Sequence, residues 1–146
     1  MTNAEIRSFL DRFVHAWETQ DVKTLGACYA SDCVVVSPIF STLRGRSEVE
    51  KSYANLFKVF SMQKVRVDDT VIGNEEPPRA VIVWNVQSTH VGEVFGVPAS
   101  GKRIERTVAY FLTLSDSLII KEVRIYDYTN MLMQLGVLRA KPAHQG

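Results

Sequence analysis

The sequence predicts an α+β domain in which long N-terminal helices pack on one face of a curved sheet. Apolar residues recur at helical spacing over about the first 60 positions, and extended segments separated by turn residues follow from residue 62 onward. Helices followed by strands in one chain are typical of α+β layers. A chain of 146 residues can bury one core, so we expect a single domain over 1–138 and a C-terminal tail over 139–146.

The first helix is predicted to begin at Thr2, because Thr2 and Glu5 have the spacing of a capping box. Its apolar stripe consists of Ile6, Phe9, Leu10, Phe13, Val14 and Trp17. Asp21 can cap a second, short helix that continues to Tyr29. Both helices therefore need a partner surface for their apolar sides.

A strand and a third helix are predicted next. The run Cys33–Val36 is rich in β-branched residues, and Pro38 ends it. Ser47 and Glu50 repeat the capping-box spacing and predict the start of the third helix. The inward side chains of that helix are expected to be Val49, Tyr53, Leu56, Phe57 and Phe60.

Four strands and a closing helix are predicted after residue 62. The strands are Gln63–Gly73, Arg79–Gly92, Arg103–Leu114 and Ser117–Tyr128. The turn residues between them suit hairpins, which predicts an antiparallel sheet. Thr129 is expected to cap the last helix, Asn130–Leu135, and Gly136 to end it.

Both faces of the predicted strands carry large apolar residues, for example Val81 and Val83 on one face and Ile82 and Trp84 on the other. A sheet that is apolar on both faces must cover the second face as well. We therefore expect a homodimer.

Composition excludes several classes of partner and site. The chain has 17 Lys and Arg against 16 Asp and Glu, so we expect no nucleic-acid surface. No stretch approaches the length of a membrane span, and the N-terminus lacks a signal-peptide pattern, so we expect a cytoplasmic protein without a membrane partner. Cys28 and Cys33 lack the spacing and the His pairs of a zinc site and are expected to be buried free thiols.

Asp127 follows the last predicted strand and is the main candidate for proton transfer. One face of that strand carries Ile119, Val123, Ile125 and Asp127. If this face lines a pocket, the surrounding hydrocarbon raises the pKa of Asp127 toward neutrality, which suits a general acid or base. The alternative is that Asp127 only caps the next helix or hydrogen-bonds a turn.

Four segments in order resemble the SnoaL-like branch of the nuclear transport factor two-like superfamily, the polyketide and ester cyclases. They are His90–Glu93, Gly96–Lys102, Glu122–Asp127 and Leu132–Gly136. The likeness covers nearly the whole chain, because the opening helix with Trp17 and the turn into the first strand also fit. The resemblance implies a cone-shaped, curved antiparallel sheet around the N-terminal helices, a deep apolar pocket, usually a dimer, and no metal or organic cofactor.

The resemblance also implies a function. In the cyclases of this family an Asp matching Asp127 is the acid/base of an intramolecular aldol ring closure, so the expected ligand is a small apolar, ketonic or polycyclic molecule. Such a reaction needs only a base and donors for the enolate. This chain has Arg124 where the family commonly has Trp, and Asp116-Ser117 where it has an Asp-Gly turn, which bears on the substrate more than on the fold.

Several other residues are candidates for the site. His90 shares a strand face with Trp84 and Ser88, so we expect it to donate to an enolate oxygen or relay a proton, or else to be structural. Glu105 and Thr107 suit a cavity wall and equally a solvated or dimer face. The remaining candidates for contact with substrate are Trp17, Tyr29, Tyr53, Asn55, Phe57, Trp84 and Arg124.

Each of these candidates has a second interpretation. Arg124 could hold a substrate carboxylate through two hydrogen bonds, or pair with Glu122 or Glu105 in a partly exposed ion pair. The aromatic candidates could line the pocket or belong to the core. Asn55 could bind a ligand carbonyl or face water.

Two classes of function remain open from the sequence. The first is an enzyme, either a cyclase or an isomerase or epoxide hydrolase on the same scaffold. An epoxide hydrolase would need an Asp-Arg-Asp set, of which Arg124 and Asp127 supply part. The second is a non-catalytic module that binds a ligand or dimerises, since one fold can host both classes.

Overall fold

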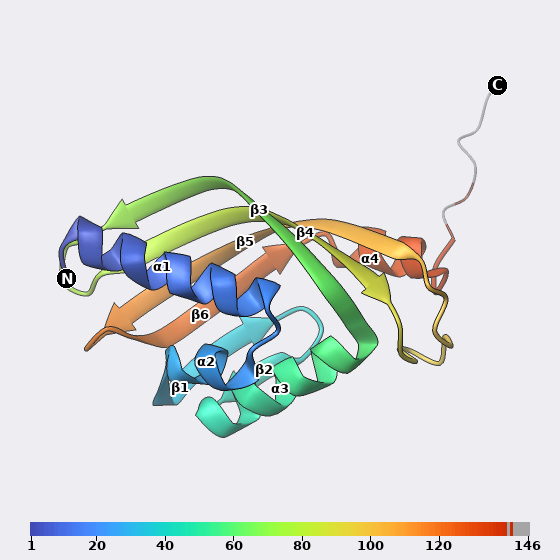
Figure 1. Ribbon diagram of the computed structural model, residues 1–146, viewed down its shortest axis with the longest axis horizontal. Coiled ribbons are helices and arrows are strands. Elements are labelled where there is room, and N and C mark those ends of the chain that lie inside the picture. Colours follow the sequence, from blue (N-terminus) through green and yellow to red (C-terminus); the bar gives the residue numbers. More distant parts are fainter. Residues whose placement is uncertain (140, 142–146) are drawn as a thin grey trace.

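The computed structural model describes residues 1–139 and 141, apart from the side chain of residue 62, so the predicted tail 139–146 lies almost wholly outside the described residues. Four helices and six strands follow one another along the chain (Figure 1). Their order is α1 (Asn3–Glu18), α2 (Val22–Ala27), β1 (Tyr29–Ser37), β2 (Ser41–Arg44), α3 (Arg46–Val59), β3 (Phe60–Gly73), β4 (Arg79–His90), β5 (Arg103–Ser115), β6 (Leu118–Tyr126) and α4 (Tyr128–Leu135).

The six strands form one sheet in the order β2-β1-β6-β5-β4-β3. Strands β3 to β6 are antiparallel neighbours, as predicted. The sheet as a whole is mixed, because β1, which lies outside these hairpins, runs parallel to β6. Strand β2 forms a hairpin with β1 and pairs with one of its edges, so the other edge of β1 is free to pair with β6. The sheet curls around α1, while α2 and α3 lie on the same side of it (Figure 1).

The caps of the first two helices confirm the sequence prediction. The Glu5 N–H donates to Thr2 Oγ1 over 3.1 Å, and the Thr2 N–H donates to Glu5 Oε2 over 2.7 Å. Asp21 caps α2 by accepting from the Thr24 N–H over 3.1 Å. These bonds pair amide groups that the helices themselves leave free.

Three local predictions are wrong, and one strand was not predicted. Helix α3 begins after Gly45, which has a φ of 88° and supplies no side-chain cap, and not at Ser47. Tyr29 begins β1 and does not end the second helix, and β2 is missing from the prediction because its four residues are mostly exposed. Helix α4 is capped by Asp127 and not by Thr129.

An aromatic core fills the space between the helices and the inner face of the sheet. Trp84 lies 5.4 Å from Trp17 and 5.0 Å from Tyr110, measured between ring centroids, and both pairs meet edge to face. The aromatic candidates for the site all belong to this buried core: Trp17, Tyr29, Tyr53, Phe57 and Trp84. Their mutual contacts stabilise the fold.

The ends of many elements meet at one end of the sheet, which we call the mouth. Antiparallel neighbours run in opposite directions, so the C-terminal ends of β4 and β6 lie beside the N-terminal ends of β3 and β5. The segment 91–102 between β4 and β5, the C-terminus of α3 and the start of α4 belong to the same end (Figure 1). A site at the mouth can therefore draw side chains from distant parts of the sequence.

Candidate functional site

The inner face of the sheet carries buried polar side chains toward the mouth. Strand β4 turns Trp84, Ser88 and His90 inward, and each is at most 1% exposed, which confirms the shared face predicted for them. On β5, Arg106 is the Cα partner of Val86 and is 9% exposed. We call Ser88, His90 and Arg106 the inner-wall patch.

His90 is held in one orientation by Ser100. The Ser100 N–H donates to Nδ1 over 3.3 Å, and the Ser100 hydroxyl lies 2.9 Å from the same nitrogen. Because Nδ1 accepts a hydrogen bond, the proton of the neutral ring sits on Nε2. Nε2 is buried and has no hydrogen-bond partner in the described part of the chain. His90 therefore presents a free N–H donor to the interior.

The other members of the patch also lack partners. Ser88 Oγ and Arg106 Nε are buried, and no described residue hydrogen-bonds either of them. Arg106 Nη1 reaches only the Met131 thioether at 3.9 Å, and the guanidinium lies 5.5 Å from the centre of the Tyr126 ring. Buried polar groups are paired in the great majority of cases, so this patch calls for partners from outside the chain.

Sequence reasoning missed Arg106, although a signal for it exists. Residues Ile104, Val108, Tyr110 and Leu112 share its strand face and are all buried. A charged residue inside an apolar alternating pattern is unusual, because an unpaired buried charge is unfavourable. That interruption of the pattern distinguishes Arg106 from the many arginines expected at the surface.

A small apolar pocket opens at the mouth beside the patch. Its volume is about 80 Å³, and the Phe60 ring on its wall lies 5.8 Å from the His90 ring. The lining residues are Ile39, Phe40, Asn55, Leu56, Val59, Phe60, Val94 and Phe95. Drug-sized ligands usually occupy about 300 to 1,000 Å³. The pocket beside the patch is therefore much smaller than the deep pocket that the resemblance implies, and a polycyclic ligand would need it to widen.

Asn55 and Asp127 both lie at this end, and both are exposed. Asp127 Oδ1 accepts the Asn130 N–H over 2.8 Å, so the carboxylate caps α4. The next residue, Tyr128, contacts Phe95 of the mouth pocket, with the ring centroids 6.1 Å apart. The expectation that hydrocarbon surrounds Asp127 is wrong, because its side chain faces solvent at the rim of the mouth.

A β-bulge explains why Ile119 does not share a face of the sheet with Val123 and Ile125, as the alternation along the sequence predicted. Ile119 pairs with Leu114, whereas Lys121 pairs with Thr113, so Ile120 is an extra residue in β6. One extra residue moves every later side chain to the other face. Beyond the bulge, Glu122 and Arg124 therefore face inward.

Glu105 and Thr107 do not line the interior. Both are exposed and lie on the outer face of β5, opposite Arg106. Glu105 Oε1 accepts from Asn85 Nδ2 over 2.8 Å. Of the two environments expected for this pair of residues, the outer face is the one observed.

A closed ring of hydrogen bonds occupies the core beside the patch. Arg124 Nε donates to Glu122 Oε2 over 2.6 Å, and the Tyr29 hydroxyl donates to Glu122 Oε1 over 2.7 Å. The Tyr29 and Tyr53 hydroxyls lie 2.6 Å apart, and Arg124 Nη2 donates to the Tyr53 oxygen over 3.1 Å. We call these four side chains the buried ring. Arg124 pairs with Glu122 as one interpretation expected, but the pair is buried instead of partly exposed.

Burial shifts the pKa values of groups in and around the ring. Loss of solvation raises the pKa of Tyr29 and of Tyr53 well above the usual tyrosine value, and the charge of Glu122 adds to both shifts. Burial likewise raises the pKa of Tyr110. Burial alone would lower the pKa of Arg124, but Tyr110, Tyr53 and Glu122 raise it well above the usual arginine value. The ring is therefore stable with neutral tyrosines and one charged pair.

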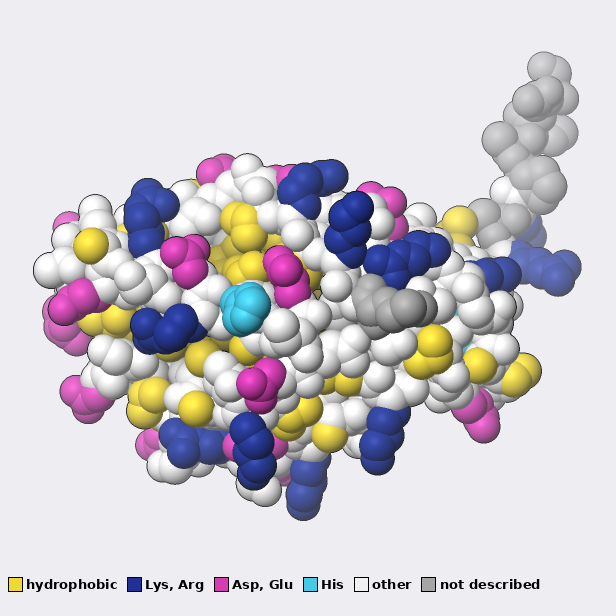
Figure 2. Space-filling view, in the orientation of Figure 1, with side chains coloured by type: hydrophobic (Ala, Val, Ile, Leu, Met, Phe, Trp, Pro, Cys, Tyr) yellow, Lys and Arg dark blue, Asp and Glu magenta, His cyan; other side chains and the backbone are white. Residues whose placement is uncertain are grey.

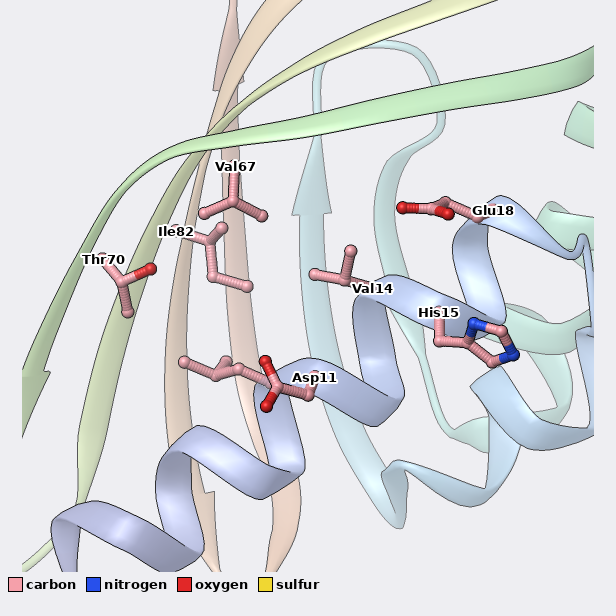
Figure 3. Close-up of a pocket in the computed structure, with 8 residues that line it drawn as sticks. Asp11, Val14, His15, Glu18, Val67, Thr70 and Ile82 are labelled. Atoms are coloured by element: carbon pink, nitrogen blue, oxygen red, sulfur yellow. The ribbon is translucent and has the colours of Figure 1, made fainter.

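A second hollow lies between α1 and the edge strand β3, and Ile82 from the inner face of β4 is among its lining residues. Its volume is about 220 Å³, and Val14, Val67 and Ile82 face one another across it, whereas the His15 ring points away (Figure 3). The space-filling view shows hydrophobic side chains here between acidic ones (Figure 2). None of the residues that line this hollow has a buried polar atom without a hydrogen-bond partner. It therefore offers a ligand fewer specific hydrogen bonds than the mouth does.

Other kinds of site are not found in the described residues. No three His, Cys, Asp or Glu side chains there are grouped so that they could hold a metal ion. Cys28 and Cys33 are free and buried, as predicted. No helix in the part of the chain that the structure describes combines the length and apolarity of a membrane span.

The fold described above is also found in known proteins. The family model for the SnoaL-like polyketide cyclases matches residues 7–135. A search of curated proteins finds no match. TsrD from Streptomyces laurentii has a similar structure, with a TM-score of 0.81 and 21% sequence identity over 94% of this chain and 99% of TsrD.

Two further solved structures have the same fold. AclR from Streptomyces galilaeus, a proposed hydroxylase, has a TM-score of 0.81 and 23% identity over 97% of this chain and 91% of its own. IdmH from Streptomyces antibioticus, a proposed polyketide cyclase, has a TM-score of 0.74 and 22% identity over 89% of this chain and 97% of its own. Identities this low establish the shared nuclear transport factor two-like fold alone.

The raised tyrosine pKa values predict a loss of stability in alkali. Unfolded tyrosines ionise near pH 10, before the buried ones can, so the unfolded state holds fewer protons and the free energy of unfolding falls as pH rises above about 10. Each buried tyrosine contributes a slope of about 1.4 kcal/mol per pH unit. The buried Cys28 thiol, with its pKa raised to about 11, acts in the same direction from a lower pH.

Denaturant unfolding followed by tryptophan fluorescence at a series of alkaline pH values measures this slope. Tyr110→Phe removes one of these tyrosines without touching the hydrogen bonds of the buried ring, so we expect a slope that is shallower by about 1.4 kcal/mol per pH unit. Wild-type protein and variant should show the same pH dependence near neutrality. Equal alkaline slopes for the two proteins would contradict the burial argument.

Proposed function

The chain belongs to the SnoaL-like polyketide cyclase family, and from this premise we propose that it is an enzyme that binds a ketonic or polycyclic small molecule at the mouth and moves a proton on it. The observation that supports this most is the inner-wall patch, in which Ser88, His90 and Arg106 hold buried polar atoms without partners. Each such atom is unfavourable when left unpaired, and although the core indoles of Trp17 and Trp84 also lack partners, the patch gathers three on one wall.

His90 is suited to stabilise an enolate. Ser100 occupies Nδ1, so the ring offers the Nε2–H as a donor to an oxygen in the interior. When a base removes a proton alpha to a carbonyl, negative charge develops on the carbonyl oxygen, and a donor already in place lowers the barrier. The enolate carbon can then attack a second carbonyl of the same molecule, and the new alkoxide takes up the proton.

Asp127 is our proposed acid/base in this reaction. Three features support the role: its match to the acid/base position of the family, its location at the mouth beside Tyr128 and Phe95, and an Oδ2 atom that no described residue hydrogen-bonds. The proposal does not depend on hydrocarbon surroundings, since the side chain is exposed. A substrate that covers the rim would itself remove Asp127 from water.

Asp127 has a capping role as well as the proposed catalytic one, and two variants separate them. Asn caps helices about as well as Asp, so we expect Asp127→Asn to keep the thermal midpoint and to lose turnover. Asp127→Ala should lose turnover and also about 1 kcal/mol of stability. Deuterium exchange alpha to the carbonyl, measured by mass spectrometry over a panel of cyclic and polycyclic ketones, reports proton abstraction even when the cyclised product is unidentified.

The exchange assay also distinguishes the competing functions. Full exchange activity in Asp127→Asn would remove Asp127 from the mechanism and make His90 the group to examine. Ligand binding by the wild-type protein with no exchange on any ketone would favour the non-catalytic binding module.

We also propose that the chain forms a homodimer through the outer face of the sheet. One row of Cα partners across five strands is apolar: Val71, Val81, Phe111, Val123 and Val36. Val71, Phe111 and Ile125 on this face are 59%, 44% and 55% exposed. Contiguous exposed apolar side chains of this kind mark interaction surfaces.

Phe111→Glu tests the dimer, because it puts a charge in the centre of the row. Analytical ultracentrifugation should show a dimer for the wild-type protein and a monomer for this variant, since an unpaired charge in an apolar interface is strongly unfavourable. Lys51→Gln makes the same change of one charge unit on the exposed side of α3 and should leave the dimer intact. A monomeric wild-type protein, or a dimeric Phe111→Glu variant, would rule out this interface.

A further inference from the structure

Arg106 is a buried cation without an anion. The described residues form three ion pairs, Lys23–Glu50, Arg66–Asp68 and Arg124–Glu122, and none includes Arg106. Its Nε has no hydrogen-bond partner, and Nη1 has only the weak thioether acceptor of Met131 at 3.9 Å. Burying a guanidinium in this way is unfavourable unless something else pairs with it.

The same core shows how this chain satisfies a guanidinium that is purely structural. Arg124 lies two strand positions from the end of β6, and it bonds both Glu122 and the Tyr53 hydroxyl. It also lies 5.2 Å from the ring centroids of Tyr53 and Tyr110. Arg106 has one aromatic contact, with Tyr126, and no carboxylate. The difference between the two arginines is therefore one of pairing and not of burial.

The nearby carboxylates do not neutralise Arg106. Glu122 is already bound by Arg124, Glu105 lies on the opposite face of β5, and Asp127 caps α4 in solvent. Burial lowers the pKa of Arg106, and the second positive charge of Arg124 acts in the same direction. The mouth thus has an excess of positive charge on its inner wall.

We infer that the substrate carries a carboxylate group, which Arg106 binds at the inner wall while His90 and Asp127 act on another part of the molecule. This inference rests on the proposed function. The free Nε and the neighbouring Nη can donate to the two carboxylate oxygens side by side, the geometry that guanidinium and carboxylate favour. The apolar mouth pocket of about 80 Å³ suits the hydrocarbon body of such a molecule.

A carboxylate fits this place better than other oxyanions. Phosphate and sulfate carry more oxygens, and those would stay unpaired against the apolar walls formed by Phe60, Val86 and Val108. A carboxylate needs only the pair of donors that Arg106 offers, and Ser88 Oγ is one further donor on the same patch. A free inorganic anion remains a testable alternative.

Matched ligand pairs test the inference. We would measure the thermal midpoint and the affinity of the full chain with a panel of aromatic and polycyclic keto-carboxylates, each beside its methyl ester and its primary carboxamide. In the wild-type protein the carboxylate should bind about tenfold or more tightly than its neutral partners, as charge-assisted hydrogen bonds do. In Arg106→Gln this advantage should disappear, and in Arg106→Lys it should be only partly retained.

A stability measurement gives a second readout that needs no ligand. Arg106→Met replaces the unpaired charge by an apolar side chain of similar length, so we expect a higher thermal midpoint than wild type. Arg124→Met, the matched control, breaks the buried ring and leaves Glu122 unpaired, so its midpoint should fall. A lower midpoint for Arg106→Met would mean that Arg106 is a structural residue and would overturn the inference.

The outcomes separate this inference from the proposed function. If esters and amides bind as tightly as acids, or if Arg106→Gln keeps the preference for acids, the carboxylate inference fails while the ligand site stands. If no compound of any kind binds, the proposed function fails and the inference fails with it. Arg106-dependent stabilisation by inorganic phosphate or sulfate equal to that by the acids would identify a site for free anions and reject a substrate carboxylate.

Discussion

The buried ring of Arg124, Glu122, Tyr29 and Tyr53 is the constraint on which the rest of the structure depends. It ties the start of β1 and the middle of α3 to β6 through four hydrogen bonds. Charges buried this deeply are tolerated only when every donor and acceptor is paired, so the ring admits few rearrangements. Because it fixes α3 against the sheet, it also fixes one wall of the mouth.

The buried polar groups at the mouth differ from those of the buried ring in their hydrogen bonding. Beside the buried ring, in which Arg124 and Glu122 bond to each other and to tyrosine hydroxyls, the chain leaves Arg106, His90 and Ser88 buried with polar atoms unpaired. Proteins commonly give up stability at functional sites in this way, because a group that is already paired within the chain cannot bind a ligand. The contrast between two parts of one core is therefore a stronger argument for a binding site than the size of the pocket.

Much of the fold could be predicted from the sequence, because the signals for it are local. The capping box at Thr2 and the inward face of β4 ending at His90 are examples. The site was harder to predict, because the positions of its side chains depend on the register of the strand pairs. The extra residue Ile120 reverses the faces of β6, so Asp127 was expected among hydrocarbon and lies in solvent. Whether Arg106 has a hydrogen-bond partner depends on which side chains α4 and β6 place beside it. The spacing of residues along the sequence does not give that information.

The claim that the inner-wall patch receives a ligand can be tested most directly at His90 by nitrogen-15 NMR of histidine-labelled protein. We expect a neutral ring protonated on Nε2, with Nδ1 accepting from Ser100, and a change in the Nε2 resonance when a ligand that raises the thermal midpoint is added. A ring protonated on Nδ1, or a His90 spectrum that stays unchanged while such a ligand is bound, would contradict it.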